Sequence, residues 1–244
     1  GYYRPTDDEF NKIWSSCYFV LDANILLDLY EYTPKTRKDF IEVLNKLSDM
    51  LWVPYQVALE YQRRRLDTIS DHEEVYEDIK RIRSRFKKSS GLTKDEFIIK
   101  IDKMLEDIET QLAVEFSDYP KISGEDKIRD EITSLLNGKV GECYDNNKLK
   151  EIYKKGETRY EERIPPGYKD GKGHYGDLVI WFQIIDKAKH DQKSIILVTD
   201  DRKEDWWWIH KGQTIGPRPE LIQEFKSNTE TQQFYMYKPD QFLE

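Results

Sequence analysis

Short apolar runs that end on acidic side chains are the dominant pattern of this chain. Residues 18–21 (Tyr-Phe-Val-Leu) lead directly into Asp22, and residues 194–199 lead into Asp200 and Asp201. Apolar runs of this length, bounded by polar residues, predict buried strands. Open α/β sheets form their sites at the carboxyl ends of such strands. The pattern therefore predicts that the chemistry lies at one edge of a sheet.

Helical and strand patterns alternate around these runs. Apolar residues at helical spacing between Phe40 and Leu47 predict a helix, and residues 51–53 predict a short second strand. Pro54 at a helix start predicts another helix that carries Glu60 in its first turns. Residues 234–237 predict a last short strand. Together these elements predict an α/β domain with a Rossmann-like, mainly parallel sheet flanked by helices.

The middle of the chain follows a different pattern. Residues 66–116 are charged and amphipathic, with an apolar stripe over 97–112, and predict a helical hairpin with its turn at Ser89–Gly91. A glycine-rich loop over 165–176 then leads to Asp177 at the start of a helix. We therefore predict one domain over 1–244, with its core at about 15–65 and 166–244 and a helical insertion at about 66–165.

Composition narrows the class of protein. The 244 residues are 38% hydrophobic and 13% aromatic, which is enough to fill a core. The net charge of −8 does not mark a nucleic-acid binder, so a polyanion has to be met by local positive charge or by metal. Cys17 and Cys143 lack the spacing of a zinc site or a disulfide framework. With no apolar run of membrane-spanning length and no signal-peptide pattern, we predict a cytoplasmic protein without a membrane partner.

Acidic residues from separate segments are candidates for a metal site. Asp22, Glu60, Asp177 and the pair Asp200 and Asp201 all fall at strand ends or on the helices that follow. Taken singly, each has a structural explanation as a cap, a turn former or a solvated helix charge. Together in one crevice, they would repel one another by several kcal/mol unless a cation lay between them. Oxygen ligands of this kind select Mg²⁺ or Mn²⁺.

Five segments carry an ordered series of motifs. They are FVLDANILLDLYEY (19–32), LWVPYQVALEYQRRR (51–65), HYGDLVIW (174–181), ILVTDDRKEDWWW (196–208) and GPRPELIQEF…FYMYKPDQFL (216–243). This series resembles the PIN-domain nuclease superfamily, and more closely a bacterial PIN-like domain subfamily. The resemblance implies a metal-dependent nuclease and favours RNA over DNA as the nucleic acid that it binds and cuts. The sequence leaves DNA open as a substrate, and toxin, antiviral defence and RNA processing all stay open as its role. Its catalytic and metal-binding acids match Asp22, Glu60, Asp177 and either Asp200 or Asp201.

Further residues are candidates around these acids. Supporting positions are Asn24, whose amide can orient a ligand or water, Thr199 and Asp205. Candidates for substrate binding are Arg63, Arg64, Arg65, Arg81, Arg83, Arg85, Lys172, His174, Arg202 and Lys203. The run Lys80–Lys88 holds six cations in nine residues, which is typical either of a phosphate contact or of a solvated helix face. The loop before Asp177 is a better candidate for a phosphate contact than the run Lys80–Lys88. The three tryptophans at 206–208 could stack on bases or pack into the core.

The chemistry follows from this set. Metal held by the acids would lower the pKa of a bound water and stabilise the leaving oxygen during attack on a phosphodiester, without a histidine or serine nucleophile.

Two alternatives stay open. One is a catalytically inert PIN-like module that binds RNA or protein. The other is a haloacid-dehalogenase-like phosphatase, which is disfavoured because Asn24 stands where that mechanism needs a second acid. The chain ends soon after the last predicted strand, as in a domain of a longer protein, so a further domain or regulatory partner is also expected.

Overall fold

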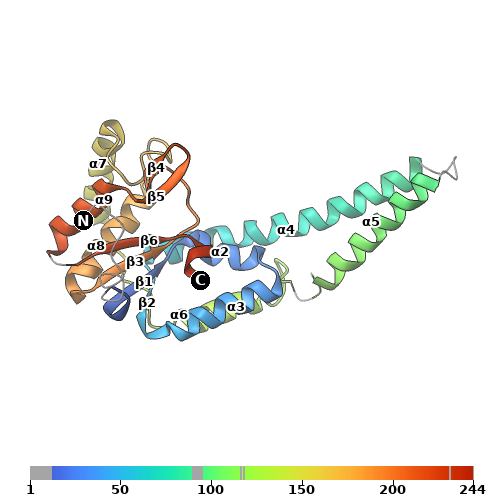
Figure 1. The fold of residues 1–244 in the computed structure, drawn as a ribbon, viewed down its shortest axis with the longest axis horizontal. Helices are drawn as coiled ribbons and strands as arrows, with labels where there is room; N and C mark the ends of the chain where they lie inside the picture. Colours follow the sequence, from blue (N-terminus) through green and yellow to red (C-terminus); the bar gives the residue numbers. More distant parts are fainter. Residues whose placement is uncertain (1–12, 90–95, 116, 118, 231, 244) are drawn as a thin grey trace.

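A four-stranded sheet forms the centre of the molecule. The computed structural model describes residues 13–89, 96–115, 117, 119–230 and 232–243. The sheet has the order β2-β1-β3-β6, and all neighbouring strands are parallel (Figure 1). Its strands are β1 (Cys17–Leu21), β2 (Leu51–Trp52), β3 (Ser194–Val198) and β6 (Phe234–Tyr237). The predicted α/β fold with a mainly parallel sheet is confirmed.

The two apolar runs lie side by side in this sheet. The register pairs Cys17 with Ser194 and Leu21 with Val198, so β1 and β3 end at the same level. All five residues of β3 are buried, as is typical of a parallel strand between helical layers. The surrounding helices are α2 (Ala23–Glu31), α3 (Pro34–Lys46), η1 (Ser48–Met50), α8 (Gly176–Asp191), α9 (Pro219–Thr229) and α10 (Pro239–Leu243). The acids that follow β1 and β3 are therefore neighbours.

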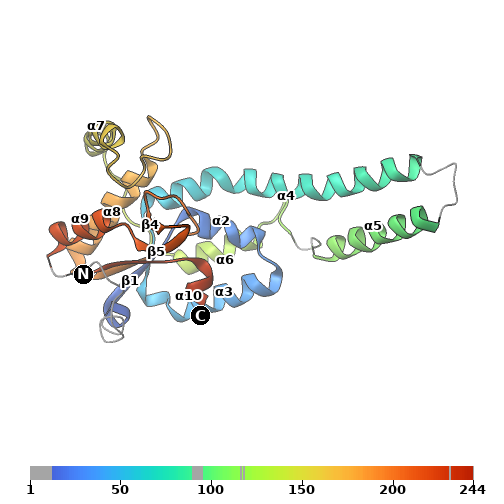
Figure 2. The ribbon, with the colours of Figure 1, turned by 45° about the horizontal axis from the view of Figure 1, so that its top comes forward.

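Helix α4 (Tyr55–Ser89) links the sheet to a projecting hairpin. It contacts α2 and α8 in the body and then packs against α5 (Glu96–Glu115), well away from the sheet (Figures 1 and 2). Its 35 residues extend about 50 Å, at about 1.5 Å per residue. The boundary predicted near residue 66 falls inside this one helix. The predicted turn begins at the last residue of α4, and residues 90–95 lie outside the described residues.

The rest of the predicted insertion belongs to the body. Helix α6 (Lys127–Leu136) buries Ile128 and Ile132 in the main core, and α7 (Asn146–Glu162) packs against α8. The sequence pattern did not separate these helices from the hairpin because all three regions are similarly charged. An antiparallel pair, β4 (Trp207–His210) and β5 (Gln213–Pro217), was not predicted. Among the described residues, no helix has the length and apolar character that a transmembrane span requires.

Candidate functional site

Asp22 lies where β1 passes into α2. It is the N-cap of α2, and its Oδ1 accepts a hydrogen bond from the Ala23 amide at 2.6 Å. Its Oδ2 accepts from Thr199 Oγ1 at 2.6 Å and from Asn24 Nδ2 at 2.9 Å. Because Thr199 follows β3, these bonds join the ends of adjacent strands. Burial and the nearby Asp177 carboxylate raise the pKa of Asp22 to about 7.

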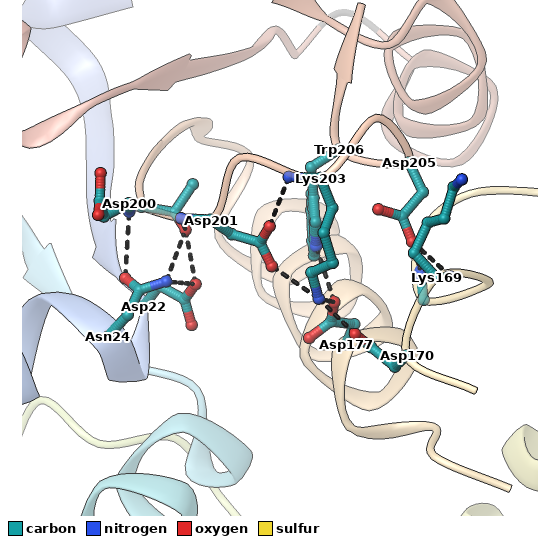
Figure 3. Close-up of polar contacts among 12 residues, drawn as sticks. Asp22, Asn24, Lys169, Asp170, Asp177, Asp200, Asp201, Lys203, Asp205 and Trp206 are labelled. Carbon is teal, nitrogen blue, oxygen red and sulfur yellow. Dashed lines mark hydrogen bonds and ion pairs between the residues drawn. The ribbon is translucent and has the colours of Figure 1, made fainter. Parts of the chain in front are cut away.

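Asn24 and Thr199 shape the turn after β3. The Asp200 amide donates to Asn24 Oδ1 at 3.2 Å, and the Asp201 amide donates to Thr199 Oγ1 at 3.0 Å. The two acids then point in different directions (Figure 3). Asp201 lines a cleft, whereas Asp200 does not and pairs with Arg202 at 3.2 Å. The geometry therefore favours Asp201 over Asp200 as an acid of the cleft.

Glu60 reaches the same cleft from α4. Its Oε1 accepts from Gln56 Nε2 at 2.8 Å, and burial raises its pKa. Gly176, at the start of α8, approaches so closely that a Cβ there would lie 2.5 Å from Glu60 Oε1. A Cβ at Gly176 would therefore displace the carboxylate end of Glu60, and the glycine leaves room for the observed position of this side chain.

Lys203 connects three acids of the cleft. Its Nζ pairs with Asp201 at 2.7 Å, with Asp177 at 3.2 Å and with Asp170 (Figure 3). Asp177 also accepts from Trp206 Nε1 at 2.9 Å. Burial opposes the charge of Lys203, but Asp177 and the other acids raise its pKa overall. Burial and Asp177 raise the pKa of Asp170 to about 7. One ammonium group thus offsets part of a dense negative charge.

Asp205 holds the loop that carries Asp170. Its side chain is completely buried, and its Oδ2 accepts from the amides of Gly167 and Lys169, both at 3.0 Å (Figure 3). Its Oδ1 is buried with no hydrogen-bond partner among the described residues. Asp205 does not line the cleft, so it acts on the site by positioning the loop.

The cleft has a volume of about 530 Å³ and is lined by half of the predicted site residues. Those that line it are Asp22, Asn24, Glu60, Arg63, Arg64, His174, Asp177, Asp201 and Lys203. Gln56 and Asp170 also line it and were missed by the sequence reasoning. Gln56 lies one helical turn before Glu60, a spacing that signals contact, whereas nothing in the glycine-rich loop distinguishes Asp170.

Several predicted substrate contacts lie elsewhere. Arg65 forms an ion pair with the buried Asp126. Its charge is therefore neutralised inside the fold and does not face the cleft. Lys172 and Arg202 are exposed side chains that do not line the cleft. The remaining three, Arg81, Arg83 and Arg85, lie on the projecting part of α4. Of the three consecutive tryptophans at 206–208, Trp206 and Trp207 are buried and Trp208 is exposed.

The donor set of the cleft suits a divalent cation. Within the described part of the chain, no three His, Cys, Asp or Glu side chains already stand close enough to hold a metal. Asp22, Glu60, Asp177 and Asp201 nevertheless line one cleft, and carboxylate oxygens are the ligands that Mg²⁺ and Mn²⁺ prefer. After burial, the nearby Asp177 carboxylate contributes to the raised pKa of Asp22, and Lys203 pairs with three acids, so the cleft concentrates negative charge.

Comparison with known proteins agrees with this geometry. The PIN like domain family model matches residues 18–221. The chain belongs to this family. This match confirms the predicted PIN superfamily. Its domains are generally nucleases that use divalent metals. No match was found among curated proteins or among solved structures.

Proposed function

We propose that this PIN-like domain is a metal-dependent endonuclease that hydrolyses phosphodiester bonds in RNA in preference to DNA. The observation that carries the proposal is the convergence of Asp22, Glu60, Asp177 and Asp201 on one cleft. The preference for RNA rests on the family resemblance. We also propose that the protein acts in the cytoplasm, since both Cys17 and the exposed Cys143 are free thiols.

The residues of the cleft have separable roles in this proposal. The four carboxylates would hold Mg²⁺ or Mn²⁺, which when bound activates water and stabilises the leaving oxygen. Thr199 and Asn24 keep the Asp22 carboxylate in a fixed orientation. The cationic side chains of Arg63 and Arg64 line the cleft and would contact the phosphates on either side of the cleaved bond.

A cleavage assay tests the proposal directly. Labelled single- and double-stranded RNA and DNA are incubated with Mg²⁺, Mn²⁺ or excess chelator. We expect cleavage of RNA with either metal, and loss of cleavage in Asp22→Asn, Glu60→Gln and Asp201→Asn. Asp200→Asn is the matched control, because this neighbouring acid lies outside the cleft and should retain activity. Undiminished cleavage in chelator would refute the metal mechanism.

Lys203 allows metal binding to be measured without activity. Because its ammonium group neutralises three acids, Lys203→Met should leave the cleft with greater need for a cation. We expect Mn²⁺ to raise the melting temperature of Lys203→Met by more than it raises that of the parent, as measured by thermal denaturation with and without chelator. An equal or smaller rise would show that the ammonium group does not compete with metal.

A further inference from the structure

The projecting hairpin exposes apolar side chains on both of its helices. Val75 and Ile82 of α4 are 57% and 55% exposed, and Phe97, Met104 and Ile108 of α5 are 67%, 57% and 41% exposed. The distal part of the hairpin stands clear of the body in both views (Figures 1 and 2). Groups of exposed apolar side chains of this kind mark docking surfaces.

These side chains lie on one side of the hairpin. Arg83 faces α5, because it pairs with Glu109 at 2.6 Å. Leu105 is partly buried on α5, and α4 is the helix that packs against α5. Ile82 precedes Arg83 by one residue, and Met104 precedes Leu105 by one residue, which is a rotation of about 100° in each helix. Because the two helices run antiparallel, the same rotation points both side chains to the same side of the pair.

Charge along α4 is divided into two blocks. Residues 67–78 contain six acidic residues and no Lys or Arg, and residues 80–88 contain six Lys or Arg and no acid. Two copies of α4 that pack in parallel would place like charges together. Antiparallel packing about a two-fold axis between Asp78 and Ile79 instead places each block against its opposite. The same axis brings Val75 of one copy beside Ile82 of the second copy.

We propose that the α4–α5 hairpin is a dimerisation arm that packs antiparallel on the hairpin of a second copy of this chain. The interface is isologous, since the same apolar side and the same two charge blocks are used by both copies. Protein is favoured over nucleic acid as the partner because the arm exposes apolar side chains and carries an acidic block as large as the basic one, which would repel phosphate. Some cations of the basic block also have partners within the hairpin. Arg81 pairs with Asp78 at 3.2 Å, and Arg83 pairs with acids of α5.

Sedimentation equilibrium of the full chain tests the interface. We expect a dimer at micromolar concentration, and at least a tenfold increase in the dimer dissociation constant in Ile82→Asp and in Met104→Asp. Both residues are exposed, so the variants should keep the parent's helical circular dichroism. Ile99→Asp is the matched control, because Ile99 is 59% exposed but lies on the other side of α5 and should leave the dissociation constant unchanged.

Cross-linking tests the register independently of variant stability. In a Cys143→Ser background, Asp78→Cys should form an intermolecular disulfide, since Asp78 lies beside the proposed axis and on the apolar side. Ser84→Cys, on the opposite side and farther from the axis, should not. A monomeric parent at tens of micromolar, or equal cross-linking of both variants, would overturn the proposal. A monomer whose RNA affinity, measured by fluorescence anisotropy, falls in Arg85→Glu would overturn it in favour of a nucleic-acid arm.

Discussion

At the residue scale, Asp22 combines a structural and a chemical task. As the N-cap of α2 it accepts a backbone hydrogen bond, and as an acid of the cleft it lies near Asp177. Its pKa of about 7 in the folded chain is well above its ordinary value of about 3.9. The folded state therefore binds a proton more tightly than the unfolded state. This contribution to stability is complete below about pH 4 and is lost as the pH rises through 7.

The raised pKa of Asp22 predicts how the stability of the fold changes with pH. In chelator, the free energy of unfolding of the parent should fall between pH 5 and pH 8, and Asp22→Asn should remove about 1–3 kcal/mol of the fall. Urea denaturation at the two pH values measures it. Asp49→Asn, at an exposed position, serves as the control and should show the parent's pH dependence. If Asp22→Asn retained the full decrease, another group would be responsible.

Gly176 gives a second prediction at this scale. A methyl group there would lie 2.5 Å from Glu60 Oε1, so Gly176→Ala should displace Glu60 and lower cleavage activity by at least tenfold. Gly216→Ala is the matched control, because a Cβ at that glycine meets no atom within 4 Å. Full activity of Gly176→Ala would show that the position of Glu60 is not critical for the chemistry.

At the element scale, the loop before α8 is held by one buried acid. Asp205 binds two loop amides, and the same loop delivers Asp170 to Lys203. Asp205→Ala removes the oxygen that accepts both amide hydrogen bonds, so it should destabilise the fold by about 1–3 kcal/mol and speed hydrogen exchange over 167–170. Mass spectrometry of peptides after hydrogen exchange measures the exchange rate both in the loop and in the sheet. Equal acceleration in β3 would indicate global unfolding rather than release of the loop.

At the scale of the whole molecule, the proposed function requires a chain of net charge −8 to bind a polyanion. Arg63 and Arg64 line the cleft, so Arg63→Gln with Arg64→Gln should weaken RNA binding and reduce its salt slope by about 1–2. Fluorescence anisotropy across a salt titration measures both quantities. Arg202→Gln removes an exposed cation outside the cleft and should retain the parent's slope. An unchanged slope in the double variant would place the phosphate contacts elsewhere.

Much of this architecture was predictable from local pattern. The apolar runs of β1 and β3 are buried because only a sheet covered on both faces removes such runs from water, and the acids that follow them must then share one edge. The helix that carries Glu60 was predictable from the proline before it. The apolar runs, the polar residues that bound them and the proline before α4 thus determined the fold class and the segments that supply the site.

Tertiary structure decided which side chains meet. Asp200 and Asp201 are adjacent in sequence, and their backbone amides donate hydrogen bonds to Asn24 and Thr199 in a turn that places Asp201 in the cleft and Asp200 outside it. The ion pairs of Lys203 and the removal of Arg65 from the site likewise depend on contacts between distant segments. Periodicity describes the direction of a side chain within a helix or strand. It carries no information on the path of a turn or on the partner of a charge, and these are set by packing.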